Sequence, residues 1–147
     1  MKKIVLFILC LNIPLSSQWS LQTDQFNKPV VKIYFHDSFT GWLAVAGSYT
    51  FGTTGNFALT TNSGSSWNTV LSGTPYSDFD FINNSTGWLV GTSATDFPPY
   101  QIGFLLKTTN GGLNFIHQRV DTGRSLIAID FLNQNSGWLC TSQNKIY

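Results

Sequence analysis

The aspartates are the first side chains to test for catalysis. The chain of 147 residues has seven acidic residues, and all of them are aspartate. Asp78 and Asp80 are two positions apart, so in a β-strand both carboxylates lie on one face, where they could hold a metal or exchange protons. Phe79 and Phe81 then lie on the opposite face. Because Asp130 repeats the Asp80 position in a later copy of the pattern, we interpret this polar face as solvated and not catalytic.

Histidine and cysteine provide no second chemical site. His36 and His117 are far apart in the sequence, and two scattered histidines do not make a metal-binding set. Cys140 takes the position that Ala44 and Val90 have in the other repeats, and no base is near it in sequence, which indicates a small buried residue. We therefore predict no catalytic residue, no metal and no cofactor.

The composition favours an all-β protein. Only 10% of residues are charged, 15% are aromatic and 13 are glycine. This is too aromatic for a disordered chain and too poor in charge for long solvated helices. The formal net charge is +1 and no basic run occurs, so nucleic acid is not an expected partner.

The N-terminus has the pattern of a secretory signal peptide. Met1, Lys2 and Lys3 precede the apolar stretch 4–11, which is too short to span a bilayer. Small polar residues follow, and we predict cleavage near residue 18, so that residues 1–18 are removed. The mature protein is then secreted or periplasmic, without a membrane span. Cys140 is its only cysteine, so no internal disulfide can form.

A Gly-Trp-Leu segment occurs three times and organises the chain. The pairs recur after 46 and then 50 residues, and in each copy a phenylalanine precedes the glycine by six positions. A period of this length with several short β segments is typical of propeller blades. The pairs are Gly41 and Trp42, Gly87 and Trp88, and Gly137 and Trp138, and the phenylalanines are Phe35, Phe81 and Phe131.

A second repeated element has the composition of a tight turn. Its asparagine side chain can accept hydrogen bonds from backbone amides of the turn, a glycine allows a positive φ, and an aromatic residue covers the hairpin. We predict structural turns at two places 48 residues apart. Their residues are Thr60, Asn62, Gly64, Ser66 and Trp67 in the first copy and Thr108, Asn110, Gly112 and Phe115 in the second.

Each period therefore holds four predicted strands. In the first unit they span 30–36, 41–47, 56–61 and 66–71, and Trp19 is expected to begin a further N-terminal strand. The prediction for residues 19–147 is a partial β-propeller of about two and a half four-stranded antiparallel blades plus that strand. Closed propellers have roughly 4–8 blades, so unpaired strand edges are expected, and with them self-association.

The turn segment resembles the Asp-box, or BNR repeat, with Asn62 and Asn110 in place of the usual aspartate. Together with the Gly-Trp strands it resembles the repeat of the photosystem II assembly and stability factor family, and the stretch 107–112 matches that repeat closely. The resemblance covers residues 19–147 and implies a BNR-type propeller. Members of the family bind reaction-centre precursors during assembly. The matching residues are structural, so the resemblance specifies a fold more than a partner.

Other Asp-box propellers are sialidases, so glycosidase chemistry must be considered. A sialidase needs an arginine triad, a Tyr/Glu nucleophilic pair and an acid, whereas this chain has only Arg119 and Arg124 and no glutamate. We therefore expect no enzymatic activity. A carbohydrate-binding or glycosidase-derived propeller is the alternative function, and a truncated fragment of a longer propeller protein is another.

The loop at 93–100 is the place where we expect a binding contact. It is longer than its counterpart at 48–55, and it carries Phe97 and Tyr100 beside two prolines. The leading hypothesis is a secreted, non-catalytic propeller module that acts in protein interaction or assembly scaffolding, with an unknown protein as partner and carbohydrate as the alternative ligand.

Overall fold

The computed structural model describes residues 21, 25–47, 54–94, 101–120 and 124–147. These residues form ten strands in three antiparallel sheets, and no helix among them could cross a membrane. The strands are β1 (Val30–Phe35), β2 (Gly41–Val45), β3 (Asn56–Thr60), β4 (Asn68–Ser72), β5 (Tyr76–Phe81), β6 (Gly87–Ala94), β7 (Gln101–Thr108), β8 (Ile116–Gln118), β9 (Leu126–Asn133) and β10 (Ser136–Thr141). The all-β prediction is confirmed.

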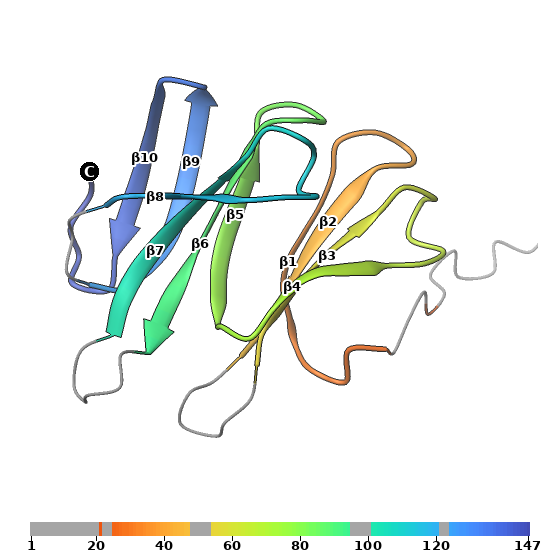
Figure 1. The fold of residues 1–147 in the computed structure, drawn as a ribbon, viewed down its shortest axis with the longest axis horizontal. Coiled ribbons are helices and arrows are strands. Elements are labelled where there is room, and N and C mark those ends of the chain that lie inside the picture. The colour runs from red at the N-terminus through yellow and green to blue at the C-terminus, as the bar shows by residue number, and fades with distance from the viewer. Residues whose placement is uncertain (1–20, 22–24, 48–53, 95–100, 121–123) are drawn as a thin grey trace, which may run out of the picture.

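Each sheet pairs strands in the order in which they follow along the chain. The orders are β1-β2-β3-β4, β5-β6-β7-β8 and β10-β9, and Figure 1 shows the three sheets side by side. We call β1, β5 and β9, the first strand of each sheet along the chain, the inner strands. The register is the same in all three sheets, because the phenylalanine of each inner strand pairs with the glycine six residues after it. The pairs are Phe35 with Gly41, Phe81 with Gly87 and Phe131 with Gly137. Two full blades and half of a third confirm the partial propeller.

The strand boundaries in the first blade agree with the predicted spans to within two residues. The strand predicted at 41–47 ends at Val45, and the strand predicted to begin at 66 begins at Asn68. The second difference has a local cause, because the backbone amide of Ser66 bonds to a side chain of the preceding turn. The strand predicted at Trp19 lies outside the described residues.

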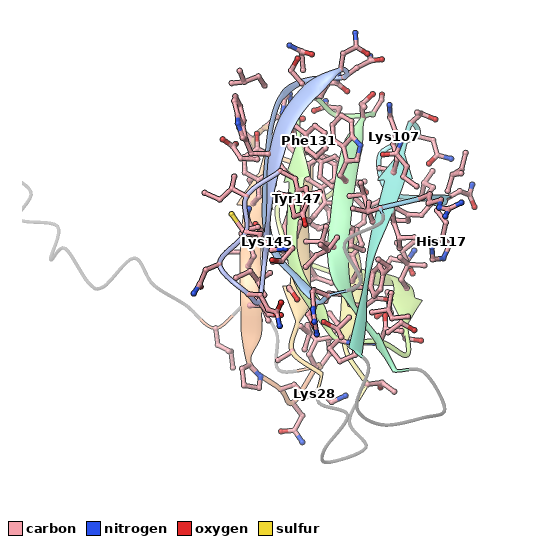
Figure 2. The ribbon with its side chains drawn as sticks, turned by 90° about the vertical axis from the view of Figure 1, so that its left-hand side faces the viewer. Lys28, Lys107, His117, Phe131, Lys145 and Tyr147 are labelled. Carbon is pink, nitrogen blue, oxygen red and sulfur yellow. The ribbon has the colours of Figure 1, made fainter. Side chains whose placement is uncertain are left out.

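The last residues pair with β10 where the third strand of a blade is expected. Leu139 and Tyr147 exchange two backbone hydrogen bonds of 3.1 and 3.0 Å, and Cys140 pairs with Ile146. In the first blade the equivalent pairs join β2 to β3. Lys145 and Tyr147 lie against the β9–β10 sheet in Figure 2.

The hydrophobic core lies between the sheets. One buried cluster joins Trp42 and Phe57 of the first sheet to Phe79 and Phe81 of the second. A second cluster joins the second sheet to the third, with Trp88, Val90 and Leu105 packed on Leu126 and Ile129. A large apolar side chain that is fully buried contributes about 1.5–3 kcal/mol, so contact between neighbouring blades is a main source of stability.

Candidate functional site

The turn between β3 and β4 is closed by its own side chains. The Thr60 hydroxyl donates to Asn62 Oδ1 over 2.9 Å and accepts from the backbone amide of Gly64 over 3.0 Å. Asn62 Oδ1 also accepts from the amide of Ser66 over 2.9 Å. Gly64 has φ +83°, which a residue with a side chain rarely adopts. Threonine, asparagine and glycine at this spacing therefore fix the turn locally.

The turn between β7 and β8 has the same geometry. The Thr108 hydroxyl donates to Asn110 Oδ1 over 3.0 Å and accepts from the amide of Gly112 over 2.9 Å, and Asn110 Oδ1 accepts from the amide of Asn114 over 3.0 Å. Gly112 has φ +90°. The oxygens of both asparagines are occupied within their own turns, so they serve the fold and leave no free acceptor for a metal.

The aromatic residue after each turn packs on a phenylalanine. Trp67 is buried and meets the ring of Phe35 edge-on, with 5.8 Å between centroids. Phe115 is half-buried and meets Phe57 edge-on at 5.6 Å. Edge-to-face pairs of this kind add to the stabilisation from burial.

The glycine of each Gly-Trp pair makes room for an aromatic ring of its own blade. A Cβ atom at Gly41 would lie 2.7 Å from the ring of Phe35, and one at Gly87 would lie 2.5 Å from Phe81. A Cβ atom at Gly137 would meet the paired phenylalanine of its own sheet at 2.5 Å. Any larger residue at these positions would displace the ring.

The tryptophan of each Gly-Trp pair meets the next sheet where there is one. Trp42 stacks on Phe81 and Trp88 stacks on Phe131, each with 3.8 Å between ring centroids. Trp42 Nε1 also donates to the carbonyl oxygen of Gly111 in the next blade over 2.8 Å. Trp138 is half-exposed, and among the described residues no aromatic ring stacks on it.

Asp78 and Asp80 tie three inner strands together, so their interpretation as a solvated face is wrong. Asp78 pairs with Lys32 of β1 over 2.7 Å and accepts from the amide of Ile129 of β9 over 2.9 Å. Asp80 accepts from the amide of Phe131 over 2.7 Å. These amides lie on the edge of β9 that is not paired with β10. The two carboxylates accept their hydrogen bonds, so the amides are not left without a partner.

Asp37 closes the turn between β1 and β2 and reaches the next blade. Its carboxylate accepts from the amides of Phe39 and Thr40, each over 2.7 Å, and from the Asn84 side chain over 3.2 Å. The amides of Thr40 and then Phe39 hold the pKa of Asp37 below its ordinary value. Hydrogen bonds from backbone amides favour the charged form of a carboxyl group.

The remaining residues that could do chemistry do not come together. His36 and His117 are exposed on different sheets, and Figure 2 shows His117 on the side of β7 and Lys107. Cys140 is half-buried with a free thiol, so it is more open than the small core residue expected from the sequence. Within the described ranges, no three histidine, cysteine or acidic residues gather in a way that could hold a metal.

An open apolar surface lies on β1. Ile33 and Phe35 are exposed, although their equivalents in β5 are buried against the first blade. Phe39, in the turn after β1, is also exposed. The sequence reasoning missed this surface. Among the described residues no sheet packs against the face of β1 that carries Ile33 and Phe35, whereas the equivalent face of β5 packs on the first blade. Phe97 and Tyr100 of the expected binding loop lie outside the described residues.

The comparisons with known proteins point to one kind of propeller. No protein-family model matches the sequence, and no curated protein matches it. Among solved structures, one described as YCF48 bound to D1 peptide is similar, with a TM-score of 0.58 and 26% identity. The match covers 80% of this chain and 35% of that one, so the chain spans about a third of the length of the similar protein.

YCF48 is a photosystem II assembly factor with a β-propeller fold. The shared features are the antiparallel sheets that lie side by side and the extent of the match across this chain. The chain is therefore a partial β-propeller that resembles the photosystem II assembly factor YCF48.

Proposed function

We propose that this protein is a secreted, non-catalytic β-propeller module that binds a partner polypeptide through the open side of its first blade. The observation that carries the proposal is the exposed apolar row on β1 and its following turn, made by Ile33, Phe35 and Phe39. Contiguous exposed apolar patches of this kind mark protein-binding surfaces.

A binding role agrees with what the polar side chains do. Asp78 and Asp80 hold neighbouring inner strands through backbone amides, and Asn62 and Asn110 hold turns. A catalytic acid or base must instead reach a substrate proton with its own oxygen or nitrogen. These four side chains are engaged in keeping the blades in place, which favours a scaffold.

A polypeptide partner agrees with the chemistry of the surface. The apolar row can bury aliphatic or aromatic side chains, and the amides on the outer edge of β1 can bond to an extended backbone. The similar solved structure is described with a peptide bound, which supports a protein ligand over a sugar.

Site-specific photo-crosslinking tests the proposal. A benzophenone amino acid is placed at Ile33 in cells that produce the protein, and the control carries it at Ile116, which is 72% exposed on β8. We expect polypeptide adducts from position 33 in excess over position 116. Equal yields at both positions, or no adduct at either, would refute a binding surface on β1.

Two further measurements test secretion and the absence of catalysis. N-terminal sequencing of the exported protein is expected to begin near residue 18 or 19, and a chain that keeps residues 1–18 in the cytoplasm would refute secretion. Purified protein is expected to hydrolyse no member of a glycan panel. Hydrolysis that disappears on substitution of Asp78 or Asp80 would overturn the non-catalytic role and favour the glycosidase-derived alternative.

A further inference from the structure

Each sheet has two different faces, and they meet in a fixed way. The leading face carries the inner-strand phenylalanine and points to the preceding sheet, while the trailing face carries the Gly-Trp tryptophan and points to the next. Trp42 on a trailing face meets Phe81 on a leading face, and Trp88 meets Phe131 with the same centroid distance of 3.8 Å. The chain thus contains two copies of one interface.

The same interface is present a third time as two separated halves. Phe35 and Ile33 on the first leading face are 38% and 56% exposed, against 4% and 0% for Phe81 and Phe79 at the same positions. Trp138 on the last trailing face is 50% exposed, against 1% or less for the two tryptophans that have a neighbouring sheet.

The open parts of the two faces agree in extent. On the first leading face, Leu43, Ala58 and Trp67 of the outer part form a buried cluster with Phe26 packed against it. The part on β1 is open, with Ile33 and Phe35 exposed. The last trailing face belongs to a sheet of only two strands, β9 and β10. The two-stranded sheet β9–β10 is therefore matched in size to the open part of the first leading face.

Polar groups on the two halves also correspond. Asp130 on β9 is equivalent to Asp80 on β5 and is exposed. Asp80 accepts a hydrogen bond from the backbone amide of Phe131 in the next sheet over 2.7 Å. Phe35 has the Phe131 position in β1. Because the amide of His36 bonds back within the β1–β2 hairpin and successive amides of a strand alternate, the amide of Phe35 points to the open edge.

The first blade presents a carbonyl for the indole of the last tryptophan. Trp42 Nε1 donates to Gly111 O, and Ser63 is the equivalent of Gly111 in the first blade's turn. Both residues have positive φ, +61° and +72°. Their amides bond back in the same way, Ser63 to Phe39 O over 3.0 Å and Gly111 to Ser85 O over 2.8 Å.

We propose that a second copy of this chain docks head to tail, with Trp138 of one copy stacked on Phe35 of the other. In this arrangement Asp130 accepts from the amide of Phe35, and Trp138 Nε1 donates to Ser63 O. The inference rests on the proposed function, because it names the polypeptide that covers the β1 surface. In the described residues, two copies carry four full blades and two half-blades, which lies within the roughly 4–8 blades of closed propellers, so a ring of two can close.

Mixing two variants tests the head-to-tail geometry. Trp138→Ala removes one half of the junction and Phe35→Ala removes the other, and both side chains are open enough for the fold to persist, which circular dichroism checks. By light scattering we expect the natural chain to be a dimer and each variant alone a monomer. A mixture of the two variants is expected to regain a dimer, because one intact junction forms between them.

The outcomes separate this inference from the proposed function. Ile116→Ala on β8 is the matched control and is expected to remain a dimer. A monomeric natural chain, dimers of either variant alone, or a mixture that stays monomeric would overturn the second copy. If position 33 then crosslinks to a different polypeptide, the proposed function stands and only the second copy fails. If it crosslinks to nothing, both fail.

Discussion

Replacing each Gly-Trp tryptophan by phenylalanine in turn measures how much the contact between blades stabilises the fold. Trp42→Phe removes the indole N–H that donates to Gly111 O over 2.8 Å, and leaves that carbonyl without its partner. The unpaired group costs about 1–2 kcal/mol, and the lost ring area of a fully buried residue adds about 1 kcal/mol. We expect a loss of about 2–3 kcal/mol in the free energy of unfolding.

The other two tryptophans should lose less, in a fixed order. Trp88 Nε1 donates over 3.1 Å to the Gln118 side chain, which is exposed and can bond to water instead, so Trp88→Phe should cost about 1 kcal/mol. Trp138 is half-exposed, so Trp138→Phe should change the free energy of unfolding by less than about 0.5 kcal/mol in the monomer.

Urea unfolding followed by circular dichroism gives the comparison. With a denaturant slope of roughly 1–3 kcal/mol per molar urea, the Trp42→Phe midpoint should fall by about 1 M while the Trp138→Phe midpoint stays unchanged. The samples are kept dilute enough to be monomeric, so that association does not contribute. Equal midpoints for these two variants would refute the reasoning. They would mean that burying a Gly-Trp tryptophan against the next sheet does not stabilise the fold.

Three further changes test other parts of the structure. Asp80→Ala should lower the free energy of unfolding by about 1–3 kcal/mol, because the amide of Phe131 loses its acceptor, and urea unfolding measures this. Gly87→Ala should cost about 1–3 kcal/mol, because its Cβ would lie 2.5 Å from the Phe81 ring, and thermal unfolding measures this. The pKa of Asp37 is lowered in the folded chain, so its stabilisation is present above the unfolded value and is lost as the pH falls through the folded value. Asp37→Asn should therefore flatten the acid side of the stability profile.

Each of these changes has a control and a contrary result. Asp130→Ala removes an exposed carboxylate at the same repeat position and should leave the monomer's stability unchanged, so an equal loss for Asp130 and Asp80 would contradict the bridging role. A Gly87→Ala variant as stable as the natural chain would mean that the ring moves freely. An acid limb that is as steep in Asp37→Asn as in the natural chain would exclude Asp37 as its source.

The repeats and turns could be predicted because their determinants are local. Asn62 and Asn110 bond to amides four residues away, and Gly64 and Gly112 adopt the positive φ that their turns need. The alternation of side chains places each inner-strand phenylalanine on one face whatever surrounds it. The site was harder to predict, because the open surface on β1 depends on which sheet lies beside it.

By itself the sequence therefore predicted the strands of the first blade and the repeat that makes the chain a partial propeller, while the strand predicted at Trp19 stays a prediction. The tertiary structure decided what equivalent positions do. Asp80 holds a neighbouring strand while Asp130 is exposed, and Trp42 is buried while Trp138 is half-open. The physical reason is that each strand pairs with a strand next to it in the sequence, whereas the burial of a side chain depends on the sheet that packs against it.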